Sequence, residues 1–124
     1  MMQIALHNKE KKMAKNEYYT IVAKILVYLY RKYKGLTSDS EKIIPMSDDY
    51  PVEEKQLIET IGMMQEQNFI KGIIIRDWSD EIVTVGYDSL KITPQGIDYL
   101  RENSTIRKVC ETLKEADQIW SLFM

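Results

Sequence analysis

The sequence predicts a domain of the α+β class, in which helices pack around one β-hairpin. Apolar residues recur with helical spacing in two segments, 16–34 and 52–67. Residues 68–100, NFIKGIIIRDWSDEIVTVGYDSLKITPQGIDYL, follow them and combine a hairpin pattern with the start of another helix. At 124 residues the chain is long enough to bury the core of one such domain.

The first helix is expected to begin at Asn16, which suits an N-cap and places Glu17 in the first turn. Its apolar stripe is wide enough to be buried on two sides, and it comprises Tyr18, Ile21, Val22, Ile25, Leu26, Leu29, Tyr30 and Tyr33. Lys32, Lys34 and then Gly35 are typical of a helix end, with cations in the last turn and a residue free to adopt positive φ.

Residues 36–51 are rich in turn formers, so at most one short helical turn is expected there. The next helix is expected to have Pro51 at its first position, with Glu53 and Glu54 near the positive end of the helix dipole. Asn68 suits the left-handed position that ends such a helix.

Two short runs of β-branched and aromatic residues, 73–78 and 81–87, predict a hairpin that turns at residues 79–80. Thr93 then supplies an N-cap, and Pro94 occupies the first position of a helix that continues to Asn103.

One further helix is expected over residues 104–124, with Ser104 or Thr105 as its N-cap. Its end is too apolar to leave exposed, and two alternatives remain open. The last side chains pack on the first helix within one chain, or they form a self-association interface whose candidate residues are Ile119, Trp120, Leu122 and Phe123.

The chain is expected to divide into a mobile basic arm over residues 1–15, the α+β domain over residues 16–103, and the C-terminal helix over residues 104–124. The arm has a cluster of lysines and no sustained apolar period. Met13, which is followed by Ala-Lys-Asn-Glu, is an alternative to Met1 as the natural start.

The order of helix, short turn, helix, hairpin and helix is that of a winged-helix domain whose usual second helix is much reduced. VEEKQLIETIGMMQEQNFIKG is similar to the third helix of such domains and the strand after it. Together with the ending ITPQGIDYLREN and the helix TIRKVCETLKE, these segments resemble the YjcQ family, small proteins of Gram-positive bacteria and their phages, over residues 16–118. The resemblance implies a winged-helix-like domain in a phage-associated accessory protein, with no catalytic or ligand residues to carry over.

The composition favours a non-enzymatic, cytoplasmic protein without metal or small-molecule cofactor. No apolar window approaches the roughly 20 residues that span a bilayer, and the N-terminus lacks the pattern of a secretory signal. The chain has one His and one Cys, so the clustered ligands of a metal or hydrolytic site are missing. Cys110 lies on an apolar helix stripe, where a buried, unreactive thiol is expected.

The charge is distributed unevenly along the chain. Residues 1–35 hold eight of the 17 basic residues and two of the 19 acidic ones, so they carry +6 and the other 89 residues carry −8. The expected groove-reading helix, 53–67, carries −3, and the wing, 73–90, also carries −3. Because DNA phosphates attract cations, both segments would be repelled in the usual winged-helix docking.

We therefore expect a regulatory or protein-interaction module, with a protein partner or self-association through the C-terminal helix. The alternative is a DNA-binding regulator whose candidate contacts lie in the arm and at the end of the first helix, namely Lys9, Lys11, Lys12, Lys15, Arg31, Lys32 and Lys34. A simpler interpretation is that both sets of charges are only solvated surface.

Overall fold

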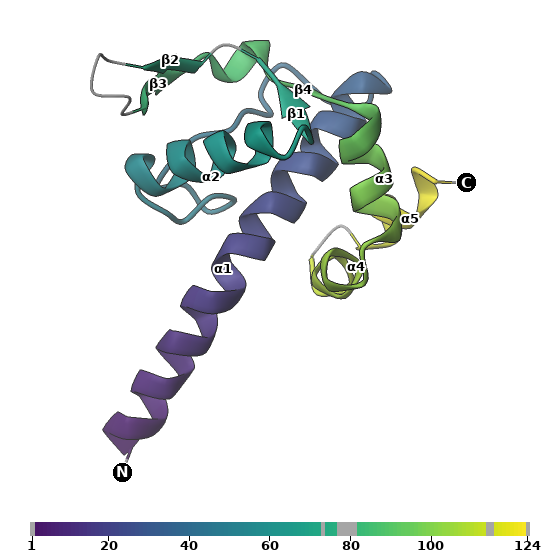
Figure 1. The fold of residues 1–124 in the computed structure, drawn as a ribbon. Helices are drawn as coiled ribbons and strands as arrows, with labels where there is room; N and C mark the ends of the chain where they lie inside the picture. The colour runs from purple at the N-terminus through teal and green to yellow at the C-terminus, as the bar shows by residue number, and fades with distance from the viewer. Residues whose placement is uncertain (1, 73, 77–81, 114–115, 124) are drawn as a thin grey trace.

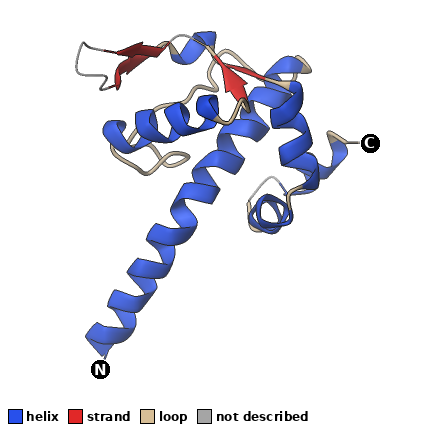
Figure 2. Cartoon of the chain, viewed as in Figure 1, coloured by secondary structure: helices blue, strands red, loops and turns tan. Residues whose placement is uncertain are grey.

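A computed structural model describes the backbone of residues 2–72, 74–76, 82–113 and 116–123 (Figure 1). It describes the side chains of residues 17–72, 74, 85–113, 116, 119 and 121–123. Helices and two small antiparallel sheets form a winged-helix-like domain of the α+β class, as predicted (Figure 2).

The helix α1 (Met2–Tyr33) runs through the centre of the domain and continues beyond it at its N-terminal end (Figure 1). The predicted start at Asn16 is wrong, because residues 2–15 consist mostly of good helix formers and contain neither Gly nor Pro to stop the helix. The buried part of α1 lies in residues 21–30, and α1 contacts α2, α3, α4 and β4. Gly35 follows the helix with φ 75°, which confirms the positive φ expected there.

Residues 36–53 form a loop in the place of the usual second helix. The loop folds back on itself, because Met46 N–H donates to Val52 O at 2.9 Å and Ser47 N–H donates to Tyr50 O at 3.3 Å. Tyr50 and Val52 are buried, so this loop contributes to the core.

The helix α2 (Glu54–Glu66) begins after this loop, with Glu53 at the N-cap. The predicted start at Pro51 is wrong, because Glu53 is still extended, with φ −65° and ψ 154°. Val52 before it is buried and accepts the bond from Met46, which holds the chain in the loop. Asn68 has φ 64°, which confirms the left-handed position expected at the end of this helix.

The predicted hairpin is confirmed, and it has two parts. The outer part pairs β2 (Ile74–Arg76) with β3 (Ile82–Val85), with an irregularity between Ile75 and Arg76. The expected turn, residues 79–80, lies outside the described residues. The inner part, the wing base, pairs β1 (Ile70–Lys71) with β4 (Lys91–Ile92). The short 3-10 helix η1 (Tyr87–Ser89) lies between β3 and β4.

The helix α3 (Pro94–Glu102) starts as predicted, with Thr93 Oγ1 accepting the Gly96 N–H at 3.0 Å. Its start lies directly against the chain that leads into β1. Thr93 donates from its hydroxyl to Asn68 O and from its N–H to Phe69 O. A Cβ atom on Gly96 would overlap the Phe69 carbonyl oxygen, so only glycine fits this close approach.

The C-terminal segment forms α4 (Ser104–Glu111) and α5 (Ala116–Ser121), so the prediction of one helix over residues 104–124 is wrong. The N-cap of α4 is Asn103, whose Oδ1 accepts the Ile106 N–H at 3.1 Å, so the prediction of Ser104 or Thr105 as N-cap is wrong. Helix α4 ends because the N–H groups of Thr112 and Leu113 donate to the carbonyl oxygens three residues before them, at Val109 and Cys110. The Thr112 hydroxyl also donates to Val109 O.

Substitution Gly96→Ala tests the contact between α3 and β1. We expect the free energy of unfolding in urea to fall by about 3 kcal/mol, since the backbone of Phe69 must move to admit the methyl group. Gln95→Ala, at the exposed neighbouring position of the same helix turn, is the control and is expected to change stability by less than about 0.5 kcal/mol. Equal stability of the two variants would contradict the packing described.

Candidate functional site

One face of α2 is turned away from the core. The buried side consists of Leu57, Ile58, Thr60, Ile61, Gly62 and Met64. Glu59, Met63 and Glu66 are exposed, and their spacing of four and three places them one above another on the outward side. Lys55, four residues before Glu59, is also exposed and lies on the same side. We call this outward set the α2 face, and it consists of Lys55, Glu59, Met63 and Glu66.

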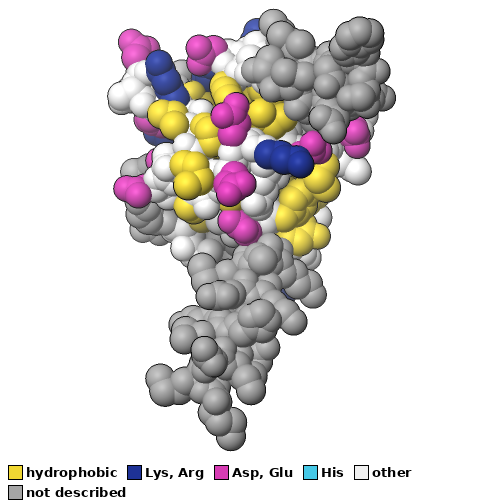
Figure 3. All heavy atoms as spheres, turned by 90° about the vertical axis from the view of Figure 1, so that its left-hand side faces the viewer, with side chains coloured by type: hydrophobic (Ala, Val, Ile, Leu, Met, Phe, Trp, Pro, Cys, Tyr) yellow, Lys and Arg dark blue, Asp and Glu magenta, His cyan; other side chains and the backbone are white. Residues whose placement is uncertain are grey.

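The α2 face is acidic. It carries Glu59 and Glu66 against the single cation Lys55, and Glu53 and Glu54 add negative charge at the start of the helix. None of these carboxylates forms an ion pair with a described side chain. Figure 3, which views the side of the molecule where α2 begins, shows acidic side chains set among hydrophobic ones. The charge that sequence counting predicted for this helix therefore lies on the surface and is not neutralised within the described part of the chain.

The loop before α2 presents two further apolar side chains, which we call the loop tip. Ile44 is 51% exposed and Met46 is 73% exposed. Met46 has φ 58°, a left-handed conformation that costs free energy in a residue other than glycine. The bond from Met46 N–H to Val52 O holds the loop tip beside the start of α2. A strained and exposed methionine is a feature that often marks a binding surface.

Side chains of α1 fix this loop in place. Arg31 bonds both carboxylate oxygens of Glu41, the closer at 2.7 Å, and the Tyr28 hydroxyl donates to Glu41 O at 2.8 Å. Lys24 Nζ donates to Asp49 O at 2.8 Å. The hydrogen bond from Arg31 lowers the pKa of the Glu41 carboxyl, although partial burial acts in the opposite direction. A cleft of about 270 Å³ lies between α1 and the loop.

The cations that were candidate DNA contacts at the end of α1 are engaged within the chain. Arg31 binds Glu41, and Lys32 Nζ donates to Asp88 O at 3.2 Å. Lys34 Nζ donates to Leu122 O at 2.5 Å and lies 5.1 Å from the centre of the Tyr30 ring.

The other candidate contacts, the side chains of Lys9, Lys11, Lys12 and Lys15, lie outside the described residues. Lys15 and Arg31 belong to one continuous helix, and the intervening residues place their backbones about 24 Å apart. The structure therefore does not bring the arm and the end of α1 together as one cationic site.

The side chains proposed as a C-terminal interface pack mainly within the chain. Ile119 and Leu122 are 1% and 4% exposed, and the Phe123 ring stacks on Tyr30 with centroids 5.4 Å apart. The Trp120 side chain lies outside the described residues. Of the two alternatives left by the sequence, packing within the chain accounts for these three side chains, and Phe123 packs on the first helix at Tyr30, because burial leaves little of their surface for a partner.

Sequence reasoning missed the pair of lysines at the wing base. Lys71 and Lys91 are exposed and stand directly opposite each other in the β1–β4 register. The charge count of the wing began at Ile73 and ended at Leu90, so it left both out. The mirrored order Ile70-Lys71 and Lys91-Ile92 on either side of the hairpin is the signal that could have revealed them.

The described residues give no support for a metal site, a reactive thiol or a membrane-spanning helix. No group of three or more His, Cys, Asp and Glu side chains among them could hold a metal ion. The predicted core thiol is confirmed, because Cys110 is 1% exposed and its burial raises the thiol pKa to about 11. Within the described chain, no helix combines the length and the apolar character needed to cross a bilayer.

Comparison with known proteins identifies the family. A family model described as YjcQ protein matches residues 23–119, which include α2, the wing, α3 and α4. The chain belongs to the YjcQ family. The resemblance predicted from its motifs is thus confirmed, and the YjcQ match begins within the part of α1 that is buried. Searches of curated proteins and of solved structures give no match.

The state of Cys110 can be tested by thiol labelling with a disulfide reagent. At pH 8 the native protein is expected to react very slowly, because a pKa of about 11 leaves about one thiolate in a thousand and the sulfur is buried. The same sample in denaturant is the control and should react at once. Rapid, complete labelling of the native protein would show that Cys110 is accessible.

The tether between α1 and the loop predicts a pH-dependent stability. The folded-state pKa of Glu41 is lowered, so its contribution is present above the ordinary glutamate pKa of about 4.3 and is lost as the pH falls through the lowered value. At pH 7, Glu41→Gln is expected to lower the free energy of unfolding by about 1 kcal/mol or less, since the pair is partly exposed. The difference from wild type should shrink below about pH 4. Asp39→Asn, an exposed neighbour, is the control, and an equal loss in both variants would contradict the tether.

Proposed function

We propose that this YjcQ-family protein is a non-enzymatic, regulatory protein-interaction module that binds its partner through the α2 face and the loop tip. The observation that carries the proposal is the composition of the outward side of α2, where Glu59 and Glu66 flank an exposed Met63. In a winged-helix domain this is the helix that would enter a DNA groove.

Electrostatics disfavours groove reading by this helix. A helix of 13 residues is about 20 Å long, and double-stranded DNA carries one negative charge per 1.7 Å or so. The α2 face would therefore lie beside on the order of ten phosphate charges while offering one lysine and two carboxylates, with Glu53 and Glu54 nearby. The cations at the end of α1 do not offset this repulsion, because Arg31 and Lys34 are bound within the chain.

The same surface suits a protein partner. Methionine side chains are flexible and polarisable, and they adapt well to apolar partner surfaces. Met63 and Met46 are 47% and 73% exposed, and the nearby carboxylates favour a partner whose surface is basic around an apolar centre. The loop that carries Met46 is fixed to α1, so it is ordered before a partner binds and association costs less entropy.

Site-specific photo-crosslinking in the native host tests this proposal. A photoreactive amino acid in place of Met63 is expected to crosslink to a protein, whereas the same group in place of Gln95, exposed on α3, should give little product. Comparable yields at the two positions, or no protein product from Met63, would remove the α2 face as a partner-binding surface.

A DNA titration tests the alternative role in DNA binding. With a labelled duplex at low salt, the wild-type protein is expected to show no saturable binding through α2. Glu59→Lys/Glu66→Lys should gain affinity for DNA that falls as salt is raised, because it removes the repulsion. Saturable wild-type binding that is weakened by Gln56→Ala would instead favour groove reading by α2. Binding that is lost when Lys9, Lys11, Lys12 and Lys15 are neutralised would favour the basic arm.

A further inference from the structure

The wing base presents two like charges directly opposite each other. Ile70 and Ile92 pair in the β1–β4 register and are 2% and 9% exposed, so they face the core. Lys71 and Lys91, the next pair along, therefore point to the outside, and both are exposed. Like charges directly opposite each other across an antiparallel pair of strands repel each other and are destabilising. An anionic group bound at this position would therefore reduce the repulsion between Lys71 and Lys91.

The described part of the chain supplies no carboxylate to this pair. Neither Lys71 nor Lys91 forms an ion pair there. A third cation is Lys32, whose Nζ donates to the backbone oxygen of Asp88 in η1, which leads directly into β4. This bond is to a neutral carbonyl group, so the charge of Lys32 is not neutralised by an ion pair in the described chain. We call Lys32, Lys71 and Lys91 the lysine cluster.

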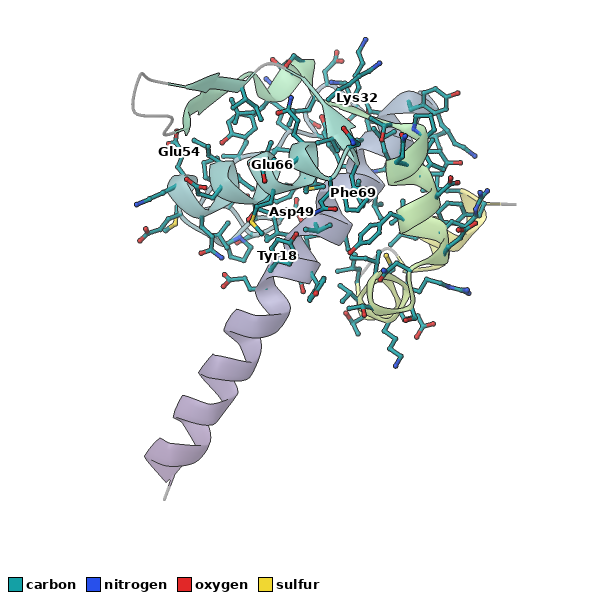
Figure 4. The ribbon with its side chains drawn as sticks, viewed as in Figure 1. Tyr18, Lys32, Asp49, Glu54, Glu66 and Phe69 are labelled. Atoms are coloured by element: carbon teal, nitrogen blue, oxygen red, sulfur yellow. The ribbon has the colours of Figure 1, made fainter. Side chains whose placement is uncertain are left out.

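Unneutralised carboxylates lie on the neighbouring element. The chain passes from α2 to β1 through the reversal at Asn68, so α2 and the wing base are consecutive elements. Figure 4 shows Glu54 and Glu66 at successive positions along α2, with Lys32 beyond them at the end of α1. The charge thus changes from negative to positive along the molecule, yet the two sets form no ion pair with each other.

We infer that the α2 face binds a second copy of this chain, whose lysine cluster lies against the carboxylates while the reciprocal contact forms at the other end of the interface. Under a two-fold axis the same contact forms twice, with the lysine cluster of each copy against the α2 face of the other. This closes the assembly as a dimer. The charges of the two surfaces are complementary, and exposed Met63 supplies an apolar group between the carboxylates. This inference rests on the proposed function and names the partner of the same surface.

The contact should be weak and sensitive to salt, because exposed ion pairs contribute little each and are screened by ions. We expect the dissociation constant of the full chain to rise by about tenfold or more between low salt and about 0.5 M salt. The interface suggested earlier at the end of the chain involves largely buried residues and should have no part in it.

Sedimentation velocity of full-length charge-reversal variants tests the inference. Lys71→Glu/Lys91→Glu and Glu59→Lys/Glu66→Lys should each be monomeric at concentrations where wild type dimerises. An equimolar mixture of the two variants should dimerise again, because both contacts in the mixed pair join a carboxylate with a lysine. The single change Lys91→Glu should already weaken the dimer, and Lys108→Glu, an exposed change of the same sign on α4, is its control and should leave the dimer intact. Circular dichroism confirms that each variant is folded.

Three sedimentation results overturn the inference. They are a wild-type chain that is monomeric at every concentration, a dimer that both double variants retain, and two monomeric variants that fail to pair on mixing. The crosslinked product from the photoreactive group at position 63 distinguishes a failure of this inference from a failure of the proposed function. A product of twice the chain's mass supports the second copy, and a product with a different protein retains the proposed function while removing the inference. The absence of any protein product removes both.

Discussion

Burial of residues 21–30 of α1 is the constraint on which the other elements depend. This segment is covered on several sides, since α1 contacts α2, α3, α4 and β4. Ala23, Ile25 and Leu26 have no exposed surface at all. Each helix that packs on α1 must turn its own apolar stripe inward, so its polar side chains form the surface of the domain. The polar surface of α2 is therefore a consequence of how the core is packed. The negative charge of that surface is the property on which the choice between a protein partner and DNA depends.

The second feature that shapes the surface is the loop over residues 36–53. A helix in this position would cover one side of α2, as the second helix does in a winged-helix domain of the usual kind. Here the chain buries Tyr50 and Val52 and is tied to α1 through Glu41, while Ile44 and Met46 remain exposed. The reduction of one helix thus leaves an apolar loop tip beside an acidic helix, and this combination favours recognition of a protein surface over recognition of DNA.

Much of the fold could be predicted because its local signals act over a few residues. Thr93 and Pro94 start α3, and Gly35 and Asn68 adopt the positive φ expected of them, because capping and left-handed turns depend mainly on the residue itself. The signals that failed depend on distant contacts. Pro51 suited a helix start, but neighbouring Val52 is buried in the core and the chain is still extended at Glu53.

The candidate site was predictable in charge but not in arrangement. The acidic α2 followed directly from counting residues, because a helix that buries one stripe exposes its carboxylates. The cations of α1 could not be placed by counting, since Arg31 binds Glu41 from a loop whose path the sequence does not determine. Lys71 and Lys91 were missed because strand register, which sets them opposite each other, is a tertiary property.

Zero-length crosslinking of a mixture of isotope-labelled and unlabelled protein tests the central claim most directly. A carbodiimide joins a carboxylate to an amine only where the two are in contact, and the labels distinguish links between copies from links within one. The account predicts links between copies that join peptides containing Glu59 or Glu66 to peptides containing Lys71 or Lys91. Links confined to single copies, or links between copies that involve only other surfaces, would contradict it.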